Sequence, residues 1–262
     1  MIEKLMPMVA DHLCLGLLVV TRIGALLAAM TSLKAVLPRR IQVIMAISIA
    51  VLLVPAVAAN SNEVLSIPTD AAGWTGLGIA IAHEALIGML IGTTIQLIVV
   101  GIQLGAEVTS ISGGLQVSST PDADTGQNMP SLAKFAGLMV VAVMFAGGGH
   151  HMILNVLLDS FSAMPPGQVS FHDSMMDLVI QQLGAGMSAG IRVAAPVVAA
   201  LLLTNLLTGL ISRTLPQLNV LAIGLSVNAL ALLIVTALTI GSAGLVFQDE
   251  LVKAADKLNQ LW

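Results

Sequence analysis

The chain has 262 residues, of which 57% are hydrophobic and 9% are charged, whereas an ordinary soluble domain has roughly 25% charged residues. Its 10 Lys and Arg residues against 14 Asp and Glu residues give a formal net charge of -4, so no basic surface is expected for a nucleic-acid partner. Cys14 is the only cysteine, which excludes an internal disulfide and a cysteine-based metal cluster.

Six apolar runs follow one another along the chain, and a membrane-crossing helix needs about 20 such residues. The runs cover residues 13–30, 41–59, 77–108, 132–146, 180–211 and 218–240. The third and fifth runs are longer than one crossing and are interrupted by Gly, Pro or charge, so we expect them to be bent or broken. No soluble domain fits between the runs. The sequence therefore predicts a single all-α integral membrane domain over residues 1–262, built from helical hairpins.

Eight of the ten basic residues lie outside the runs or close to the end of one. If the runs alternate in direction, one side of the membrane receives five of them: Lys34, Arg39, Arg40, Lys134 and Arg213. This distribution favours an arrangement with both termini outside. The tail at residues 249–262 is predicted to be an amphipathic helix, with Leu251, Val252, Leu258 and Leu261 on one face and charged residues elsewhere. We expect it to lie on a membrane surface or on a partner.

Aromatic residues make up only 3% of the chain. That is too few to form aromatic belts at both interfaces around several lipid-facing helices. We therefore expect much of the apolar surface to face protein.

Charged residues inside the apolar runs include Arg22, Glu84, Glu107 and Arg192. A charge facing lipid is costly, so each should face a partner or a wet cavity. Two interpretations remain open. The four residues form an ion or proton path, or they are buried structural pairs and residues near helix ends.

No catalytic or metal site is predicted. His83 and Glu84 begin the stretch HEALI, but a zinc-protease helix needs a second His at position 87, which is Ile. His150 and His151 are adjacent and would point about 100° apart on a helix, so they cannot chelate one ion from one face. The sequence contains no nucleophile elbow, P-loop or dinucleotide fingerprint. We expect no enzyme activity and no cofactor.

Glycines four residues apart recur on the apolar runs, a spacing that lets two helix backbones approach closely in a membrane. The pairs are Gly88 with Gly92, Gly101 with Gly105, and Gly186 with Gly190. Together with the scarcity of aromatic residues, they predict dense helix packing, either within one chain or between chains.

Two further segments are candidates for function. The stretch ISGGLQVSS at residues 111–119 follows the third run and forms either a turn at the membrane face or a mobile flap inside a pore. The stretch SRTLPQLNVLAIG at residues 212–224 should be a tight helical hairpin turn. Pro216 ends the fifth run near Arg213, and Gln217 and Asn219 can satisfy the backbone groups that the break frees.

Four stretches resemble the FliR family and its injectisome counterpart SctT, which belong to the type III export gate. They are RIGALLAAMTSLKAVLPRRIQVIMAI (22–47), GIQLGAEVTSISGGLQ (101–116), the segment from Pro130 to His151 with the run FAGGGHHMIL, and APVVAALLLTNLLTGLISRTLPQLNVLAIGL (195–225). The last stretch is the closest match, with its Arg-x-x-Pro-Gln and Asn-Val spacing.

The resemblance implies a channel subunit that exports unfolded flagellar proteins across the bacterial inner membrane, at the flagellar basal body or the base of an injectisome. Its implied partners are FliP-like, FliQ-like and FlhB-like subunits, the exported proteins and membrane lipid. The resemblance favours a gating flap, or plug loop, formed by Ser110, Ile111, Ser112, Gly113, Gly114 and Leu115. It also assigns hairpin docking to Arg213, Pro216, Gln217 and Asn219. The alternative function is a secondary transporter of a small solute or ion, with the charges Glu84, Glu107 and Arg192 forming its site.

Overall fold

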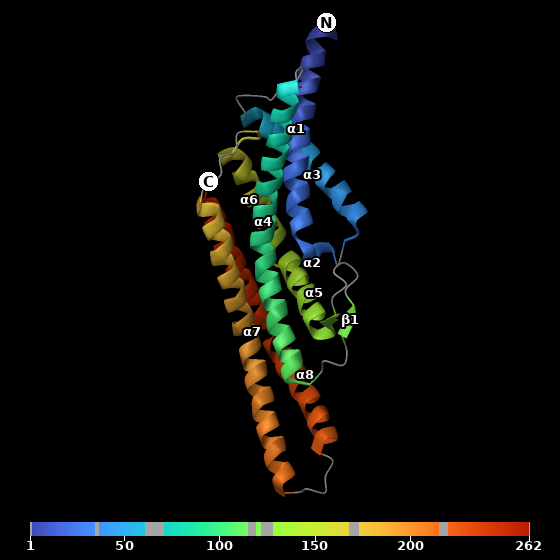
Figure 1. Ribbon diagram of the computed structural model, residues 1–262, viewed down its shortest axis with the longest axis vertical. Helices are drawn as coiled ribbons and strands as arrows, with labels where there is room; N and C mark the ends of the chain where they lie inside the picture. Colours follow the sequence, from blue (N-terminus) through green and yellow to red (C-terminus); the bar gives the residue numbers. More distant parts are fainter. Residues whose placement is uncertain are drawn as a thin grey trace. The chain divides into compact units, whose positions relative to one another are not determined.

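A computed structural model of the chain describes residues 2–34, 37–60, 71–114, 119–121, 128–167, 173–214 and 220–261. The regular structure within these ranges is helical apart from one short ribbon of two antiparallel strands (Figure 1). The helices are α1 (Ile2–Ala29), α2 (Thr31–Lys34), α3 (Arg39–Asn60), α4 (Ala71–Ser112), α5 (Ser131–Ala146), α6 (Gly149–Ala163), α7 (Asp173–Thr214) and α8 (Val220–Asn259). The strands are β1 (Ser119–Pro121) and β2 (Asn128–Pro130), with Ser119 opposite Pro130.

The predicted helical membrane fold is confirmed, with corrections of detail. Each of the six apolar runs corresponds to one helix: α1, α3, α4, α5, α7 and α8. The expectation that the third and fifth runs are broken is wrong, because α4 and α7 are each one helix of 42 residues. Pro196 lies inside α7 without ending it. The loss of one backbone hydrogen bond at a proline is therefore tolerated in the middle of this long helix.

Two features were not expected from the apolar runs. The polar helix α6 follows α5 after a turn in which Gly148 has a φ of 75°, a left-handed conformation that glycine adopts without strain. The predicted amphipathic tail is the end of α8, and Val252 on its apolar face is 43% exposed. The side chains of Leu251, Ala254 and Leu258 are already buried within the chain itself.

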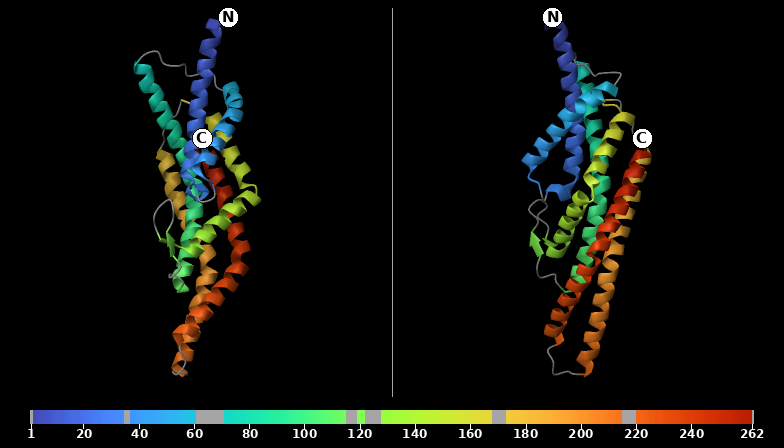
Figure 2. Two further views of the ribbon diagram at one scale, coloured as in Figure 1. Left: turned by 90° about the vertical axis from the view of Figure 1, so that its right-hand side faces the viewer. Right: turned by 180° about the vertical axis from the view of Figure 1, so that it is seen from behind.

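The chain forms two compact units, which we describe separately. The first unit comprises residues 1–96, 148–181 and 252–262, and the second comprises residues 97–147 and 182–251. In the first unit, α1 and α3 lie side by side as an antiparallel hairpin (Figures 1 and 2). Leu18 and Ile23 of α1, Ile87 and Ile91 of α4 and Leu157 of α6 are among its most deeply buried side chains.

The second unit has its own apolar core. Val197 and Leu201 of α7 and Leu232 of α8 form a buried cluster, against which Leu132 of α5 packs. These residues come from segments far apart in sequence, so the cluster joins three helices. A polar contact adds to it, because the Nδ2 of Asn228 on α8 donates to the Oδ1 of Asn205 on α7 at 2.7 Å.

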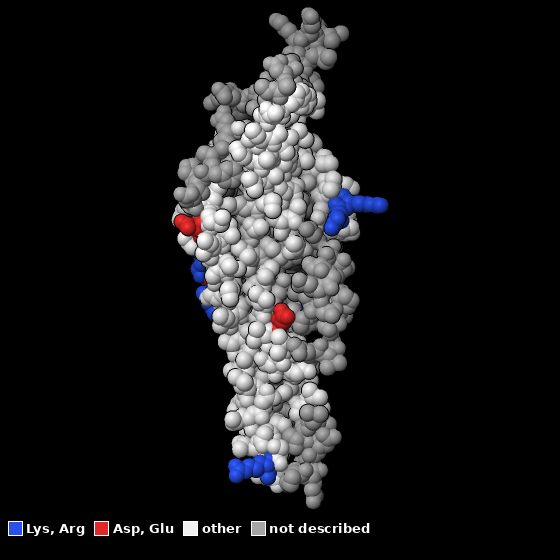
Figure 3. Space-filling view, viewed as in Figure 1, with Lys and Arg blue, Asp and Glu red and all other residues white. Residues whose placement is uncertain are grey.

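Within the described residues, four helices are long and apolar enough to cross a membrane: α3, α4, α7 and α8. A fifth span is possible by the same criterion if α5 and α6 are taken together as one interrupted span. On the face shown in Figure 3, the charged side chains of the described residues are few and are separated by wide uncharged surface. The exposed surface therefore matches an apolar environment rather than water.

Candidate functional site: a buried ion pair and glycine-packed helices

The most deeply buried charges in the described residues are Arg22 of α1 and Glu84 of α4, both in the first unit. The Nε of Arg22 donates to Oε2 of Glu84 at 2.6 Å, and its Nη2 donates to Oε1 at 3.1 Å. Both side chains have 0% exposure. The pair is therefore a two-pronged, charge-assisted contact of the kind that gives arginine–carboxylate pairs their strength and direction.

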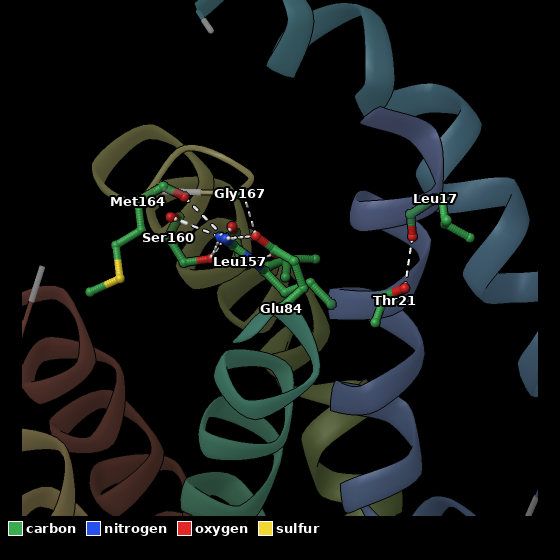
Figure 4. A network of polar contacts seen from close by, with 8 residues as sticks. Leu17, Thr21, Glu84, Leu157, Ser160, Met164 and Gly167 are labelled. Carbon is green, nitrogen blue, oxygen red and sulfur yellow. Dashed lines mark hydrogen bonds and ion pairs between the residues drawn. The ribbon is translucent and has the colours of Figure 1, made fainter. Parts of the chain in front are cut away.

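The remaining donors of Arg22 bind the end of α6. Figure 4 shows the groups around this network, with Glu84, Ser160, Met164 and Gly167 labelled. Nη1 donates to the backbone oxygen of Ser160 at 2.9 Å and to its Oγ at 3.1 Å, and Nη2 donates to the backbone oxygen of Met164 at 3.0 Å. The backbone N–H of Gly167 donates to Oε1 of Glu84 at 3.1 Å. The ring of Phe161 lies 4.2 Å from the guanidinium carbon.

All five N–H groups of the Arg22 guanidinium therefore have an acceptor. A buried charge is tolerated only when it is paired and its other polar atoms are satisfied. Arginine also stays protonated in proteins, so it cannot pass a proton along a relay. For Arg22 and Glu84, this geometry favours a structural pair over an ion path.

The other two predicted intramembrane charges are not part of this network. Arg192 of α7 pairs with Glu250 of α8 at 3.2 Å in the second unit, where the two side chains are 50% and 5% exposed. The Nη2 of Arg192 also lies 3.3 Å from the Oγ of Ser188. Glu107 is partly exposed on α4. The sequence did not single out Glu250, because it lies in the polar tail beyond the last apolar run.

The first glycine pair, Gly88 and Gly92, lies where α4 contacts α1 in the first unit. A Cβ added at Gly88 would overlap the backbone oxygen of Arg22, and one added at Gly92 would overlap that of Leu26. The next closest atoms are the Cβ atoms of Ala25 and Ala29. The two backbones are therefore in direct contact, one helical turn from the Arg22–Glu84 pair.

The other glycines meet one another in the second unit. A Cβ on Gly101 of α4 would overlap the backbone oxygen of Gly186 of α7, and a Cβ on Gly105 would overlap that of Gly190. The contact is reciprocal, because a Cβ on Gly190 would overlap the backbone oxygen of Gly101. The structure thus brings together two of the three predicted glycine pairs, within one chain.

The predicted gating segment begins inside a helix. Ser110, Ile111 and Ser112 form the last turn of α4, and Gly113 and Gly114 form the turn that follows. Gly114 has a φ of 75° and donates its N–H to the backbone oxygen of Ile111 at 3.1 Å, an arrangement typical of a glycine that ends a helix. A Cβ on Gly113 would lie 3.1 Å from a methyl of Leu232. Leu115 lies outside the described residues.

Of the predicted hairpin residues, the structure describes Arg213. It is an exposed residue in the last turn of α7, which ends at Thr214, close to the predicted end. Pro216, Gln217 and Asn219 lie outside the described residues. Within the described part of the chain, no three His, Cys, Asp or Glu side chains gather in a metal-binding arrangement.

Long apolar helices, backbones that touch through glycine and a satisfied buried ion pair together define a polytopic helical membrane protein. A family model described as bacterial export proteins, family 1, matches residues 13–254. The chain belongs to this family, and the resemblance to FliR and SctT is thereby confirmed.

Three relatives illustrate the similarity. The flagellar biosynthetic protein FliR of Caulobacter vibrioides is 26% identical over 233 residues, which cover 88% of this chain and 90% of that protein. FliR of Escherichia coli is 26% identical over 188 residues, 71% of this chain and 69% of that protein. The surface presentation of antigens protein SpaR of Shigella flexneri is 28% identical over 148 residues, 56% of this chain and 57% of that protein.

Proposed function

We propose that this chain is a core subunit of the type III protein export gate in the bacterial inner membrane, and that it serves the flagellum. The single observation that carries the proposal is the family match over residues 13–254. The flagellar assignment is supported by the similarity to FliR of Caulobacter vibrioides over 88% of this chain and to FliR of Escherichia coli over 71%.

The proposed partners are FliP-like, FliQ-like and FlhB-like subunits, which would surround a shared channel for unfolded proteins. The apolar surface supports this assembly. In the most apolar windows of α7 and α8, only 17% and 11% of the residues are buried within the chain. Aromatic residues are too few, at 3%, to anchor so much surface at lipid interfaces. Partner helices therefore account for the uncovered faces better than lipid alone.

We propose that the segment from Ser110 to Leu115 gates this channel. The packing of Gly113 against Leu232 fixes the end of α4, and the left-handed Gly114 sets the direction in which the chain leaves it. Ile111 is 48% exposed and offers an apolar side chain for closure. Arg213, exposed at the end of α7, is proposed to dock the hairpin on a neighbouring subunit.

Copurification tests the assembly. The tagged chain, extracted from its native membrane in mild detergent, is expected to bring down at least two other membrane subunits. The chain alone, reconstituted in vesicles, is expected to move no solute. Recovery of a stable, partner-free monomer that transports an ion or a small solute would instead establish the transporter function and refute the gate.

Leakage tests the gating segment. Replacing Gly114 with Val should prevent the left-handed turn and should raise ion leakage through the assembled complex or lower secretion of export substrates. Gly76→Val, on α4 but outside the gating segment, is the matched control, because a Cβ at Gly76 meets nothing within 4 Å, and it should change neither. Unchanged leakage and unchanged secretion in the Gly114→Val complex would remove the gating assignment.

Charge reversal tests the docking residue. Arg213→Glu should reduce recovery of the assembled complex, because the proposed contact requires a cation at the end of α7. Arg213→Lys keeps the charge and should retain most of the assembly. Normal assembly together with normal secretion in the Arg213→Glu strain would refute the docking role.

A further inference from the structure

A groove of about 390 Å³ runs between α1 and α3 in the first unit. Its apolar wall consists mainly of side chains from two helical faces: Val20, Gly24 and Ala28 of α1, with Val43, Ala46 and Ile47 of α3. The volume falls within the range of about 300–1,000 Å³ that is usual for small-ligand sites. The groove is thus large enough for a ligand and almost entirely apolar.

The groove has a cationic end. Arg39, the first residue of α3, contributes to its lining, and Arg40 is exposed beside it. Within the described residues, neither guanidinium forms an ion pair. The first turn of α3 contains no acidic residue. The positive end of the helix dipole and two arginines therefore coincide at one place, and the residues that the structure describes form no ion pair with either arginine.

The groove and its cations occur at the level where a lipid headgroup would lie. α3 is apolar enough to cross a membrane from Arg39 to Ala58, so Arg39 and Arg40 mark the boundary between hydrocarbon and headgroups. Beyond them, α3 exposes an apolar surface, with Ile44 at 63%, Val51 at 67% and Leu52 at 74% exposure. The groove thus has an apolar wall and two cations at one end. These match the acyl chain and the anionic headgroup of a phospholipid.

We propose that this groove binds one anionic phospholipid, with its phosphate held by Arg39, Arg40 and the start of α3, and one acyl chain lying between α1 and α3. A helix from a partner fits the space less well. A helical turn is about 10 Å wide and 5.4 Å long, so the groove has room for about one turn. An extended acyl chain needs no such width, and basic pockets between membrane helices are known to bind acidic headgroups.

Lipid competition tests this site. The full chain, purified in mild detergent with any subunits that copurify, is incubated with equal amounts of phosphatidylglycerol and phosphatidylcholine, and bound lipid is counted by native mass spectrometry. The wild-type protein should retain phosphatidylglycerol preferentially. Arg39→Gln should lower its retention about fivefold, the effect expected for one charge near an anionic headgroup, and should leave phosphatidylcholine unchanged.

A second variant probes the apolar part of the groove. A Cβ at Gly24 meets nothing within 4 Å, so Gly24→Leu should fill the groove without displacing the backbone. It should lower the retention of both lipids. Gly78→Leu on α4 is the matched control, because Gly78 also has open space around it and does not line the groove. This control should retain lipid as the wild type does.

Two results would overturn the proposal. One is unchanged phosphatidylglycerol retention in both Arg39→Gln and Gly24→Leu. The other is a photocrosslinking amino acid in place of Ala28 that captures a protein subunit of the assembled complex and no lipid. The first outcome removes the site, and the second assigns the groove to a partner helix. Neither outcome bears on the export-gate proposal, which rests on the family match and on copurification.

Discussion

Two ion pairs in the described part of the chain, Arg22–Glu84 and Arg192–Glu250, hold their charges in different ways. Arg22 and Glu84, in the first unit, are both 0% exposed, and the guanidinium reaches acceptors on α4 and at the end of α6. Arg192, in the second unit, is 50% exposed, pairs with Glu250 and lies within hydrogen-bond distance of Ser188. The first pair therefore connects α1, α4 and the end of α6 in one arrangement. In the second pair, the side chain of Arg192 remains half exposed.

The glycine contacts differ in a related way. In the first unit, Gly88 and Gly92 face a helix that carries alanines, and the ion pair adds direction to the contact. In the second unit, glycines lie on both helices, and α4 and α7 touch backbone to backbone. The comparison indicates that a buried ion pair stabilises the first unit, whereas close backbone packing between α4 and α7 stabilises the second. Four substitutions test it, from the largest expected effect to the smallest.

Glu84→Gln should be the most damaging change. It leaves the buried guanidinium of Arg22 without a counter-charge, which typically costs about 3–5 kcal/mol. Thermal unfolding of the purified chain in detergent should show the loss. The double variant Arg22→Met with Glu84→Leu should recover most of it, because removing both charges removes the burial cost. A Glu84→Gln protein as stable as the wild type would contradict the structural role of the pair.

Gly186→Ala should come next. Its Cβ would overlap the backbone oxygen of Leu97, and such overpacking costs about 1–3 kcal/mol. Gly184→Ala, two residues earlier on α7, is the control, because a Cβ there meets nothing within 4 Å. The free energy of unfolding of the Gly184→Ala protein should rise by up to about 1 kcal/mol, because alanine has a higher helix propensity than glycine. Equal melting temperatures for the two variants would show that the close approach of α4 and α7 does not stabilise the second unit.

Glu250→Gln makes the same kind of substitution in the Arg192–Glu250 pair. We expect a loss of at most about 1 kcal/mol, as for exposed ion pairs, because Arg192 can be solvated when its partner is neutral. The same unfolding assay measures it beside Glu84→Gln. If the two variants lost equal stability, the distinction between the two ion pairs would fail.

Asn228→Leu should have the smallest effect. The amide oxygen of Asn228 is buried without a hydrogen-bond partner, and its nitrogen makes one contact to Asn205. Polar contacts between membrane helices average about 0.6 kcal/mol, and removing the unsatisfied oxygen offsets part of that. A melting temperature within error of the wild type is expected, and a large loss would show that polar contacts also hold the second unit.

Much of the fold could be predicted from apolar run length alone, because a run of the right length in this composition forms a helix. The helix α6 was missed because His150, His151, Asn155 and Asp159 dilute its apolar character. The breaks expected in α4 and α7 were wrong because glycine and proline interrupt a pattern without ending a helix that tertiary contacts support.

The site could be predicted only in part. Glycine spacing indicated that backbones approach one another, but it did not say that Gly101 meets Gly186, since that pairing depends on tertiary structure. The sequence identified the four intramembrane charges, but it did not show which charged residues pair with one another. Arg22 and Glu84 are 62 positions apart, and no local periodicity relates them. Glu250 was missed because a carboxylate in a polar tail is usually solvated.

The order in which the chain is made gives the Arg22 network a further consequence. Arg22 leaves the ribosome 62 residues before Glu84 and 138 residues before Ser160. Until those residues have been synthesised, α1 carries an unpaired cation whose insertion into the hydrocarbon of the membrane would be costly. α1 is therefore expected to remain at the membrane surface or beside the insertion machinery. It can reach its final position only after α4 and α6 have been synthesised.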